Sequence, residues 1–245
     1  MKKSIAFAVC QALLCLCVVS AQELIQIDQA DPPFMYAQDG RPAGLYPRII
    51  TEAFSRMATG VEISAVPWKR ALSDTDAGKA GTAGIYKNSE RLKNYDFSSP
   101  FFEERIAVYS LGGKLKFTKL QDLFGKTVGV IDGWSYGDEF DAAVLAGKIR
   151  VETVNGDTNN MRKLAYSHVD AVLAIVESGE LALKKMKLES TIQRAPVFFA
   201  IYNVHLAFNK SAGKTKLLAR FDEAIESMKA DGTLSILAAK SFRSQ

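Results

Sequence analysis

Strand-like and helix-like hydrophobic patterns alternate along the first part of the chain after residue 23. In residues 45–57 apolar side chains recur every three or four positions, which predicts an amphipathic helix with Pro47 in its first turn. Shorter apolar runs predict strands on either side of it. The expected order is strand 24–28, helix 45–57, strand 61–66, helix 68–72 and strand 82–86. This order is typical of a parallel sheet with crossover helices.

The same alternation starts again after a strand at 104–110 and the pair Gly112-Gly113. We expect further strands at 127–131, 149–154, 169–175 and 198–208, and helices at about 135–145, 159–166, 177–187, 213–230 and 232–242. Two such blocks in series predict two α/β lobes. The final strand and helices could complete either block.

The first 21 residues differ from the rest of the chain. Lys2 and Lys3 precede an apolar run at 5–19, and Val19-Ser20-Ala21 places small residues where a signal peptidase cleaves. The apolar run is about 15 residues long, whereas a membrane-spanning helix needs ~20. We therefore predict a cleaved signal peptide at 1–21 and a periplasmic protein.

Removal of this segment changes the charge and the chemistry of the chain. The formal net charge falls from +4 to +2 with the loss of two lysines, too little to indicate a nucleic-acid or membrane-surface partner. Cys10, Cys15 and Cys17 leave as well, so the remainder cannot form disulfides or a thiol nucleophile. With only two histidines, no metal site and no cofactor are expected.

Five sequence blocks in order resemble the bacterial extracellular solute-binding proteins, family 3, which serve polar amino-acid ABC transporters. The resemblance runs from about residue 24 to 242. The blocks are Pro33-Phe34 with Gly40 and Gly44-Leu45; Ser89-Glu90-Arg91-Leu92-Lys93 with Asp96-Phe97-Ser98-Ser99-Pro100-Phe101; Leu123-Phe124-Gly125-Lys126-Thr127-Val128-Gly129-Val130 with Gly133; Val169-Asp170-Ala171-Val172; and Met228-Lys229-Ala230-Asp231-Gly232-Thr233.

The resemblance implies a periplasmic-binding-protein-like fold of type II, in which two α/β lobes are joined by two crossover hinge strands. Lobe 1 would comprise about 22–108 and 206–245, and lobe 2 about 109–205. The hinges would lie near 107–110 and 202–206. A solute would be held in the cleft between the lobes.

Arg91 matches the family position that grips the carboxylate of the ligand, and a guanidinium suits this role because it bonds both carboxylate oxygens at once. A surface arginine paired with Glu90 or Asp96 is the alternative. Ser135 and Tyr136 follow Gly133 at an expected helix start, where free N–H groups favour an anion. The family uses this turn for the same carboxylate, whereas a simple Ser N-cap is the alternative.

Aromatic residues gather in the loops expected to face the cleft. Phe34, Trp68, Tyr86 and Trp134 are candidates for lining it, although any one of them could be core. Family members that bind α-amino acids commonly hold the ammonium with an acidic residue at the position of Ile175. Here only Glu177, two positions later, could substitute, so the sequence supports a carboxylate better than an amine.

Two enzymatic readings compete with solute binding. Gly133-Trp134-Ser135-Tyr136-Gly137 fits the G-x-S-x-G nucleophile elbow, but neither His168 nor His205 is placed as its base, and no glycine-rich oxyanion loop precedes it. A few relatives are cleft dehydratases, which need a general acid such as Glu177 or Glu103.

The sequence thus predicts a non-enzymatic solute-binding protein. We expect a monomer that closes on a small carboxylate-bearing molecule and presents it to an inner-membrane ABC permease or a sensor receptor.

Overall fold

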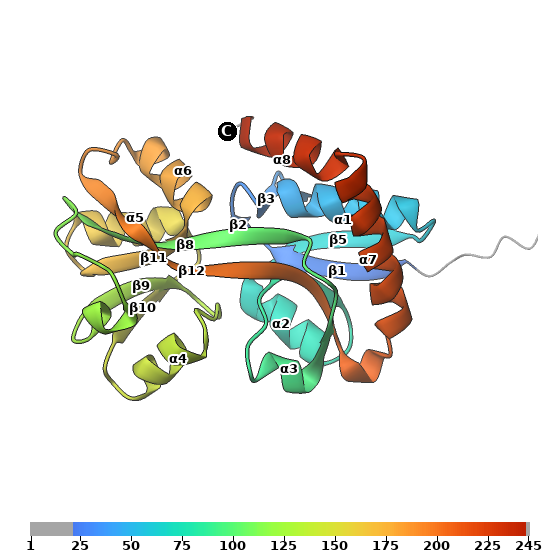
Figure 1. Cartoon of the computed structure of the whole chain (residues 1–245), viewed down its shortest axis with the longest axis horizontal. Coiled ribbons are helices and arrows are strands. Elements are labelled where there is room, and N and C mark those ends of the chain that lie inside the picture. The colour runs from blue at the N-terminus through green and yellow to red at the C-terminus, as the bar shows by residue number, and fades with distance from the viewer. Residues whose placement is uncertain (1–21, 244–245) are drawn as a thin grey trace, which may run out of the picture.

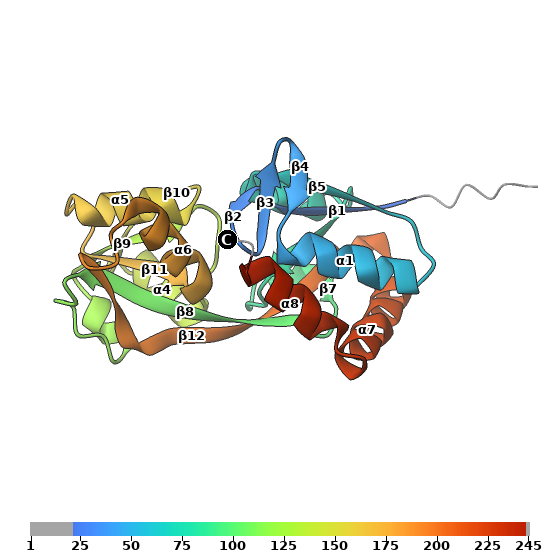
Figure 2. The same ribbon diagram turned by 90° about the horizontal axis from the view of Figure 1, so that it is seen from above.

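Residues 22–243 are described by a computed structural model, and the predicted signal peptide lies outside this range. Two α/β lobes lie side by side, and two long strands run between them (Figures 1 and 2). This is the architecture expected from the two α/β blocks of the sequence. No helix in the described range is long and apolar enough to cross a membrane.

The first lobe is built on three parallel strands, β1 (Glu23–Asp28), β5 (Val61–Val66) and β6 (Gly81–Ile85), with β1 in the middle. Helices α1 (Leu45–Arg56) and α2 (Trp68–Asp76) connect them. The apolar positions that predicted α1 are buried, which confirms that its spacing marks the core-facing side. Helix α2 runs past the predicted end at residue 72.

A three-stranded sheet beside this lobe was not predicted. It comprises β2 (Ala30–Asp31), β3 (Met35–Gln38) and β4 (Arg41–Ala43), in that order. The sequence analysis assigned most of this stretch to turns, because strands of two to four mixed residues carry no readable alternation. The sheet brings Asp31 to the side of the lobe that faces the other lobe.

The two lobes are joined by β8 (Phe102–Leu111) and β12 (Ile192–Asn209), which pair antiparallel from Val204 opposite Phe102 to Ile192 opposite Leu111. At one end β12 pairs with β6, and at the other β8 pairs with β11. The sheet order is therefore β10-β9-β11-β8-β12-β6-β1-β5. The lobe boundaries proposed from the sequence fall within these two strands and remain predictions.

The second lobe repeats the parallel arrangement with β9 (Thr127–Ile131), β10 (Arg150–Val154) and β11 (Ala171–Ile175). Its helices are α4 (Asp138–Leu145), α5 (Asp157–Ala165) and α6 (Val176–Met186), and a short 3-10 helix η1 (Leu120–Leu123) precedes β9. All five residues of β11 are buried, as expected for an apolar run that lies between two other strands.

The chain then returns to the first lobe. The short elements there are α3 (Arg91–Asn94), β7 (Tyr95–Phe97) and the 3-10 helix η2 (Lys210–Ala212). Helices α7 (Thr215–Ala230) and α8 (Thr233–Arg243) pack against α1. The rings of Phe54 and Phe221 lie 6.1 Å apart across the contact between α1 and α7.

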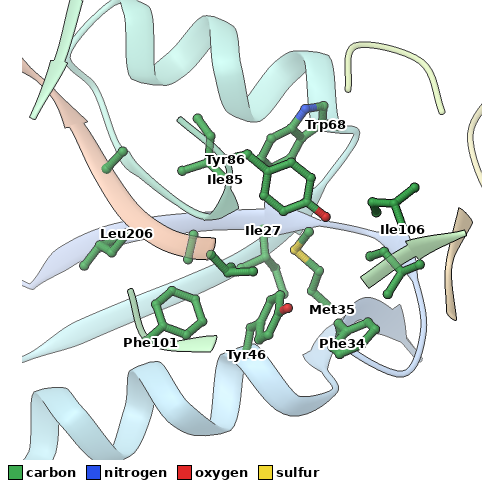
Figure 3. Packing of buried hydrophobic residues seen from close by; sticks show 14 of the residues in the cluster. Ile27, Phe34, Met35, Tyr46, Trp68, Ile85, Tyr86, Phe101, Ile106 and Leu206 are labelled. Atoms are coloured by element: carbon green, nitrogen blue, oxygen red, sulfur yellow. The ribbon is translucent and has the colours of Figure 1, made fainter. Parts of the chain in front are cut away.

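Figure 3 shows buried hydrophobic side chains packed around β1 in the core of the first lobe. Trp68 and Tyr86 lie on one side of β1, whereas Tyr46 and Phe34 lie on the other side, beside α1. Phe34 has no exposed surface, and its ring lies 5.4 Å from that of Tyr46. In this arrangement Phe34 is packed as a core residue rather than at an accessible surface.

Candidate ligand site between the lobes

The carboxyl ends of the parallel strands in both lobes point to the seam where the lobes meet. In the first lobe Asp28 ends β1, Trp68 follows β5, and Tyr86 follows β6. In the second lobe the segment 132–137 follows β9, Asp157 follows β10, and Ser178 follows β11. Ligands of open α/β sheets bind outside these strand ends. The seam is therefore where a ligand site is expected.

Direct contacts join the two sides of this seam. The indole Nε1 of Trp68 donates to the carbonyl oxygen of Gly133 at 3.1 Å. Nε1 of Trp134 donates to Oδ2 of Asp28 at 3.2 Å. Nζ of Lys69 pairs with Asp132 at 2.9 Å. The two lobes thus meet in a closed arrangement.

Arg91 lies beside the seam and is half-buried. Its Nη1 donates to the carbonyl oxygen of Tyr86 at 3.0 Å, and its backbone N–H donates to Oδ1 of Asn88 at 2.8 Å. Burial lowers the pKa of Arg91, but a guanidinium stays protonated. It forms no ion pair with a carboxylate of the described chain, so the alternative pairing with Glu90 or Asp96 is absent. A cation is thus available near the cleft.

The segment before α4 differs from its prediction. The helix begins at Asp138 instead of 135, and its N-cap is Gly137, whose φ of 93° favours glycine. The predicted helix start at Ser135 is wrong, because Oγ of Ser135 turns to Oδ2 of Asp141 at 2.7 Å.

The first turn of α4 also carries its own negative charges. Asp138, Glu139 and Asp141 all lie there, and they compete with an external anion for the positive end of the helix. Ser135 still contacts the other lobe, since Nδ2 of Asn88 donates to its Oγ at 3.0 Å. Its role in binding a carboxylate remains a prediction.

An aromatic wall lines the seam. Tyr86 stacks on Tyr202 with ring centroids 4.8 Å apart, and it meets Trp134 edge-on at 6.4 Å. The hydroxyl of Tyr202 donates to the carbonyl oxygen of Tyr136 at 2.7 Å. Tyr136 itself is buried, and its hydroxyl accepts from the N–H of Ile131 at 3.0 Å. Tyr86 and Trp134 thus meet across the seam, and their contact with a solute remains a prediction.

Three buried aspartates lie close to these aromatic residues, and one of them, Asp28, contacts Trp134 directly. Asp28 and Asp31 come from the first lobe, and Asp157 from the second. Oγ of Ser178 in the second lobe donates to Oδ1 of Asp31 at 2.7 Å. We call Asp28, Asp31 and Asp157 the acidic cluster. It contains residues from both lobes.

The electrostatics of the acidic cluster follow from burial without a counter-ion. Burial raises the pKa of Asp28 to about 6, although the hydrogen bond from Trp134 acts in the opposite direction. Burial, together with the charge of Asp28, raises the pKa of Asp157 to about 7. Burial, with the charges of Glu104 and Asp157, raises the pKa of Asp31 well above its usual range. These carboxyls therefore keep their protons to a higher pH than exposed aspartates do.

Two oxygens of the acidic cluster are left without a donor. Oδ2 of Asp31 and Oδ1 of Asp157 are buried and accept no hydrogen bond from residues 22–243. One turn after Asp157 on α5, neither side-chain amide atom of Asn160 has a partner in that range. An ammonium or guanidinium group would supply the donors and the charge that the carboxylates lack.

A fourth carboxyl, Glu104 on β8, is already engaged. It accepts hydrogen bonds from the hydroxyls of Tyr46 and Tyr86. Burial raises its pKa to about 7, against the effect of these two bonds. Glu177 lies in the first turn of α6 and pairs with Arg105 at 2.9 Å. Glu177 is therefore occupied by a cation of the protein itself.

Metal binding finds no support in the described part of the chain, where no group of three or more His, Asp or Glu side chains could hold a metal ion.

A family model for bacterial extracellular solute-binding proteins, family 3, matches residues 24–244. The chain belongs to this family. Among its relatives, the L-cystine-binding protein TcyJ of Escherichia coli (strain K12) is 27% identical over 223 residues, which cover 89% of this chain and 82% of TcyJ. The predicted family membership is confirmed, and with it the class of extracellular solute-binding proteins.

Solved structures of this family type share the fold. A histidine kinase sensor domain with similarity to periplasmic binding proteins superposes with a TM-score of 0.79 at 22% identity, covering 89% of this chain and 95% of that domain. An ancestral arginine-binding protein bound to arginine superposes with a TM-score of 0.77 at 24% identity, covering 90% of this chain and 98% of that protein. These likenesses confirm the predicted fold, that of type II periplasmic binding proteins.

Within this family 3 chain, the acidic cluster is the part of the candidate site that sequence reasoning missed. Asp28 was assigned to a strand, Asp31 to a turn, and Asp157 to the loop before a helix. The available signal was their place at or after the carboxyl ends of predicted parallel strands. That rule singles out Asp28 and Asp157, but not Asp31, which belongs to the unpredicted small sheet.

The serine-hydrolase alternative for the family 3 chain loses its geometric basis. The side chain of Ser135 bonds Asn88, Asp141 and the N–H of Gly137, and neither histidine. His205 lies in the first lobe with Nδ1 2.8 Å from the carbonyl oxygen of Ser98, and burial lowers its pKa to about 4. The ring of His168 lies near Tyr166, 6.3 Å between centroids, in the second lobe. Ser135 thus has no histidine base.

Proposed function

We propose that this chain captures a small amine-bearing solute of the amino-acid class by closing its two lobes around it. The acidic cluster holds the ammonium or guanidinium group of the solute. Arg91 faces the carboxylate of the same solute, as expected from the sequence. Tyr86, Trp68 and Trp134 pack against the part between the two charges.

The observation that carries this proposal is the pair of unpartnered carboxylate oxygens at the seam. Asp31 and Asp157 come from opposite lobes, so a cation between them attracts both lobes at once. A ligand shifts an open–closed equilibrium only through its differential affinity for the two forms. A cation that contacts both lobes provides this difference. The acid missing at Ile175 is then replaced by the acidic cluster.

The relatives support the solute class and the setting. TcyJ is a cystine-binding protein, and an arginine-binding protein shares the fold. The putative amino-acid ABC transporter-binding protein PatH of Vibrio harveyi is 24% identical over 246 residues, covering 99% of this chain and 98% of PatH. We place the mature protein in the periplasm as a monomer. Its partner is an inner-membrane ABC permease or a sensor receptor.

A binding screen tests the proposal directly. The mature chain from residue 22 is titrated with amino acids, amines and organic acids, and thermal unfolding is followed. A ligand at 100 times its dissociation constant adds about 2.7 kcal/mol of stability, which a melting curve resolves. Amine-bearing solutes are expected to stabilise the protein. Stabilisation by organic acids alone would overturn the amine assignment.

Two substitutions test which residues contact the amine and the carboxylate of the solute. Asp157→Asn and Arg91→Ala are each expected to lower affinity about tenfold or more, the cost of losing a charge-assisted contact. Asp39→Asn is the matched control, since Asp39 lies in the exposed turn between β3 and β4. If Asp157→Asn binds as tightly as the control, the acidic cluster does not contact the solute.

A cleft dehydratase is the second candidate, because protonated carboxyls near neutral pH suit general acid catalysis. Asp157, with its pKa raised by burial to about 7, is the group that fits. Glu104 has a similar pKa, but both its oxygens are held by tyrosines. Incubation with prephenate-like acids distinguishes the two functions. Turnover that is lost in Asp157→Asn would favour the dehydratase.

A further inference from the structure

A large groove opens from the seam at the acidic cluster. Its volume is about 930 Å³, and residues from both lobes line it. Ala30 and Arg48 stand on the side of the first lobe, and Asp157 and Ser178 on the side of the second. Gly156 lies against the first lobe here, where a Cβ would come within 3.1 Å of the carbonyl oxygen of Ala30.

The charges along this groove change sign from floor to rim. At the floor lies Asp157, only 8% exposed, with its unpartnered Oδ1. At the rim stand Arg48 on α1 and Lys184 and Lys185 on α6, all exposed. None of these three cations forms an ion pair with another residue of the range 22–243. The groove therefore presents buried negative charge beneath free positive charge.

This order of charges matches a particular kind of molecule. A simple cation is attracted by the floor but repelled by the rim, and a simple anion meets the opposite. A zwitterion with its ammonium inward and an anionic group outward satisfies both. In an α-amino acid a single carbon atom separates the two charged groups, whereas in a molecule of dipeptide length the charges stand much farther apart. The longer molecule is therefore the better candidate to contact the buried carboxyl and the exposed cations together.

We propose that this groove is an extension of the ligand site, built for an elongated zwitterion whose distal carboxylate reaches Arg48, Lys184 and Lys185 in place of Arg91, which faces the carboxylate of a short solute. This inference rests on the proposed function, because it takes the ammonium to be held by the acidic cluster. Arg48 belongs to the first lobe and the two lysines to the second, so the distal carboxylate also links the lobes. Solute length then contributes to closure.

A series of ω-amino acids tests the inference. Glycine, γ-aminobutyrate and ε-aminocaproate carry the same two charges at increasing separation, and triglycine extends the series with peptide groups. Affinity for the mature chain, measured by isothermal titration calorimetry, is expected to rise along the series. Added sodium chloride is expected to weaken binding of the longest members most, since the rim charges are exposed to screening.

Variants of the rim separate this inference from the proposed function. The double variant Lys184→Ala/Lys185→Ala is expected to bind ε-aminocaproate and triglycine about tenfold more weakly and glycine unchanged. Lys216→Ala/Lys240→Ala, at exposed lysines of α7 and α8, is the control for the change of two in net charge. Circular dichroism checks that each variant is folded.

The outcomes are distinguishable. If affinity does not depend on length, or if Lys184→Ala/Lys185→Ala binds the long members as Lys216→Ala/Lys240→Ala does, the inference is wrong while the proposed function stands. If Asp157→Asn leaves every member of the series unaffected, the proposed function fails and the inference with it.

Discussion

The chemistry of this site rests on a few buried carboxyls without a counter-ion. Asp28, Asp31 and Asp157 are withdrawn from water, and all have pKa values above their ordinary range because burial disfavours the charged form. A charged group in such a place attracts either a proton or a cation. The protonation state of each of these carboxyls therefore depends on whether a cation lies beside it at the seam.

These raised pKa values predict that stability depends on pH. A carboxyl whose pKa is higher in the folded chain holds its proton there after the unfolded chain has lost it, so stability falls as pH rises. The window runs from the ordinary 3.8 to the folded values of about 6 for Asp28 and about 7 for Asp157. The melting temperature without added solute is expected to fall between about pH 4 and about pH 7.

The acidic cluster, rather than titratable groups elsewhere on the surface, should cause most of this fall of the melting temperature with pH. Glu104 and Glu177 also face this region, and Arg105 offsets only Glu177. Asp157→Asn is expected to flatten the fall, whereas the exposed control Asp39→Asn is not. An equally steep fall in both variants would show that other groups cause the dependence.

Several residues show why the site was harder to predict than the fold. Ser135 is a residue type that commonly occupies the N-cap, but its hydroxyl donates a hydrogen bond to Asp141, and Gly137 is the N-cap of the helix instead. Glu104 occupies a polar position of an apparently ordinary strand, yet two tyrosines from distant segments bury it. These outcomes depend on contacts between residues far apart in sequence, which local pattern does not contain.

At the scale of elements, the sequence analysis succeeded where burial is periodic. Strand β9 (Thr127–Ile131) was predicted with its observed ends, and α1 differs from its prediction by one residue. Elements with little buried surface failed: the sheet of β2, β3 and β4 was missed, and α4 starts three residues late. Apolar spacing reports the core face of an element and says little about where polar segments turn.

The turn before α4 is a tight fit between elements. Gly137 has a φ of 93°, and a Cβ there would meet the hydroxyl oxygen of Tyr202 on β12 at 2.5 Å. Gly137→Ala is expected to cost about 2–4 kcal/mol, from the backbone strain together with the clash. Gly147→Ala is the matched control, since its φ is 69° but nothing lies within 4 Å.

Urea unfolding monitored by circular dichroism measures both glycine variants. The control should lose only the cost of the left-handed backbone, about 1 kcal/mol. Equal losses in the two variants would mean that the contact with Tyr202 does not constrain the turn.

At the scale of the whole molecule, two strands connect the lobes, and the contacts between the lobes determine whether the molecule is open or closed. Strands β8 and β12 join the lobes, so closure is decided by the contacts that the lobes make with each other (Figure 1). Some of these contacts are part-buried, as between Trp134 and Asp28, and others are more exposed, as between Lys69 and Asp132. Exposed ion pairs contribute little, about 0–1 kcal/mol.

The part-buried hydrogen bond between Trp134 and Asp28 should therefore stabilise the closed form more than the exposed ion pair between Lys69 and Asp132 does. Trp134→Phe keeps an aromatic ring but removes the indole N–H that donates to Asp28. This variant is expected to shift the population toward open forms, whereas Lys69→Ala is expected to have little effect. Spin labels at Ala77→Cys and Ala146→Cys, exposed sites in different lobes, report the separation between the lobes. The region after residue 21 contains no other cysteine. A larger opening in Lys69→Ala than in Trp134→Phe would contradict this ranking.

The central claim is that the acidic cluster binds the amine of the solute. The most direct measurement is a calorimetric cycle that pairs the tightest amino acid of the screen with its des-amino analogue, on the native chain and on Asp157→Asn. Removing the amine is expected to weaken binding to the native chain about tenfold or more, and to have much less effect in the variant. An equal loss in both proteins would show that the amine and Asp157 do not interact.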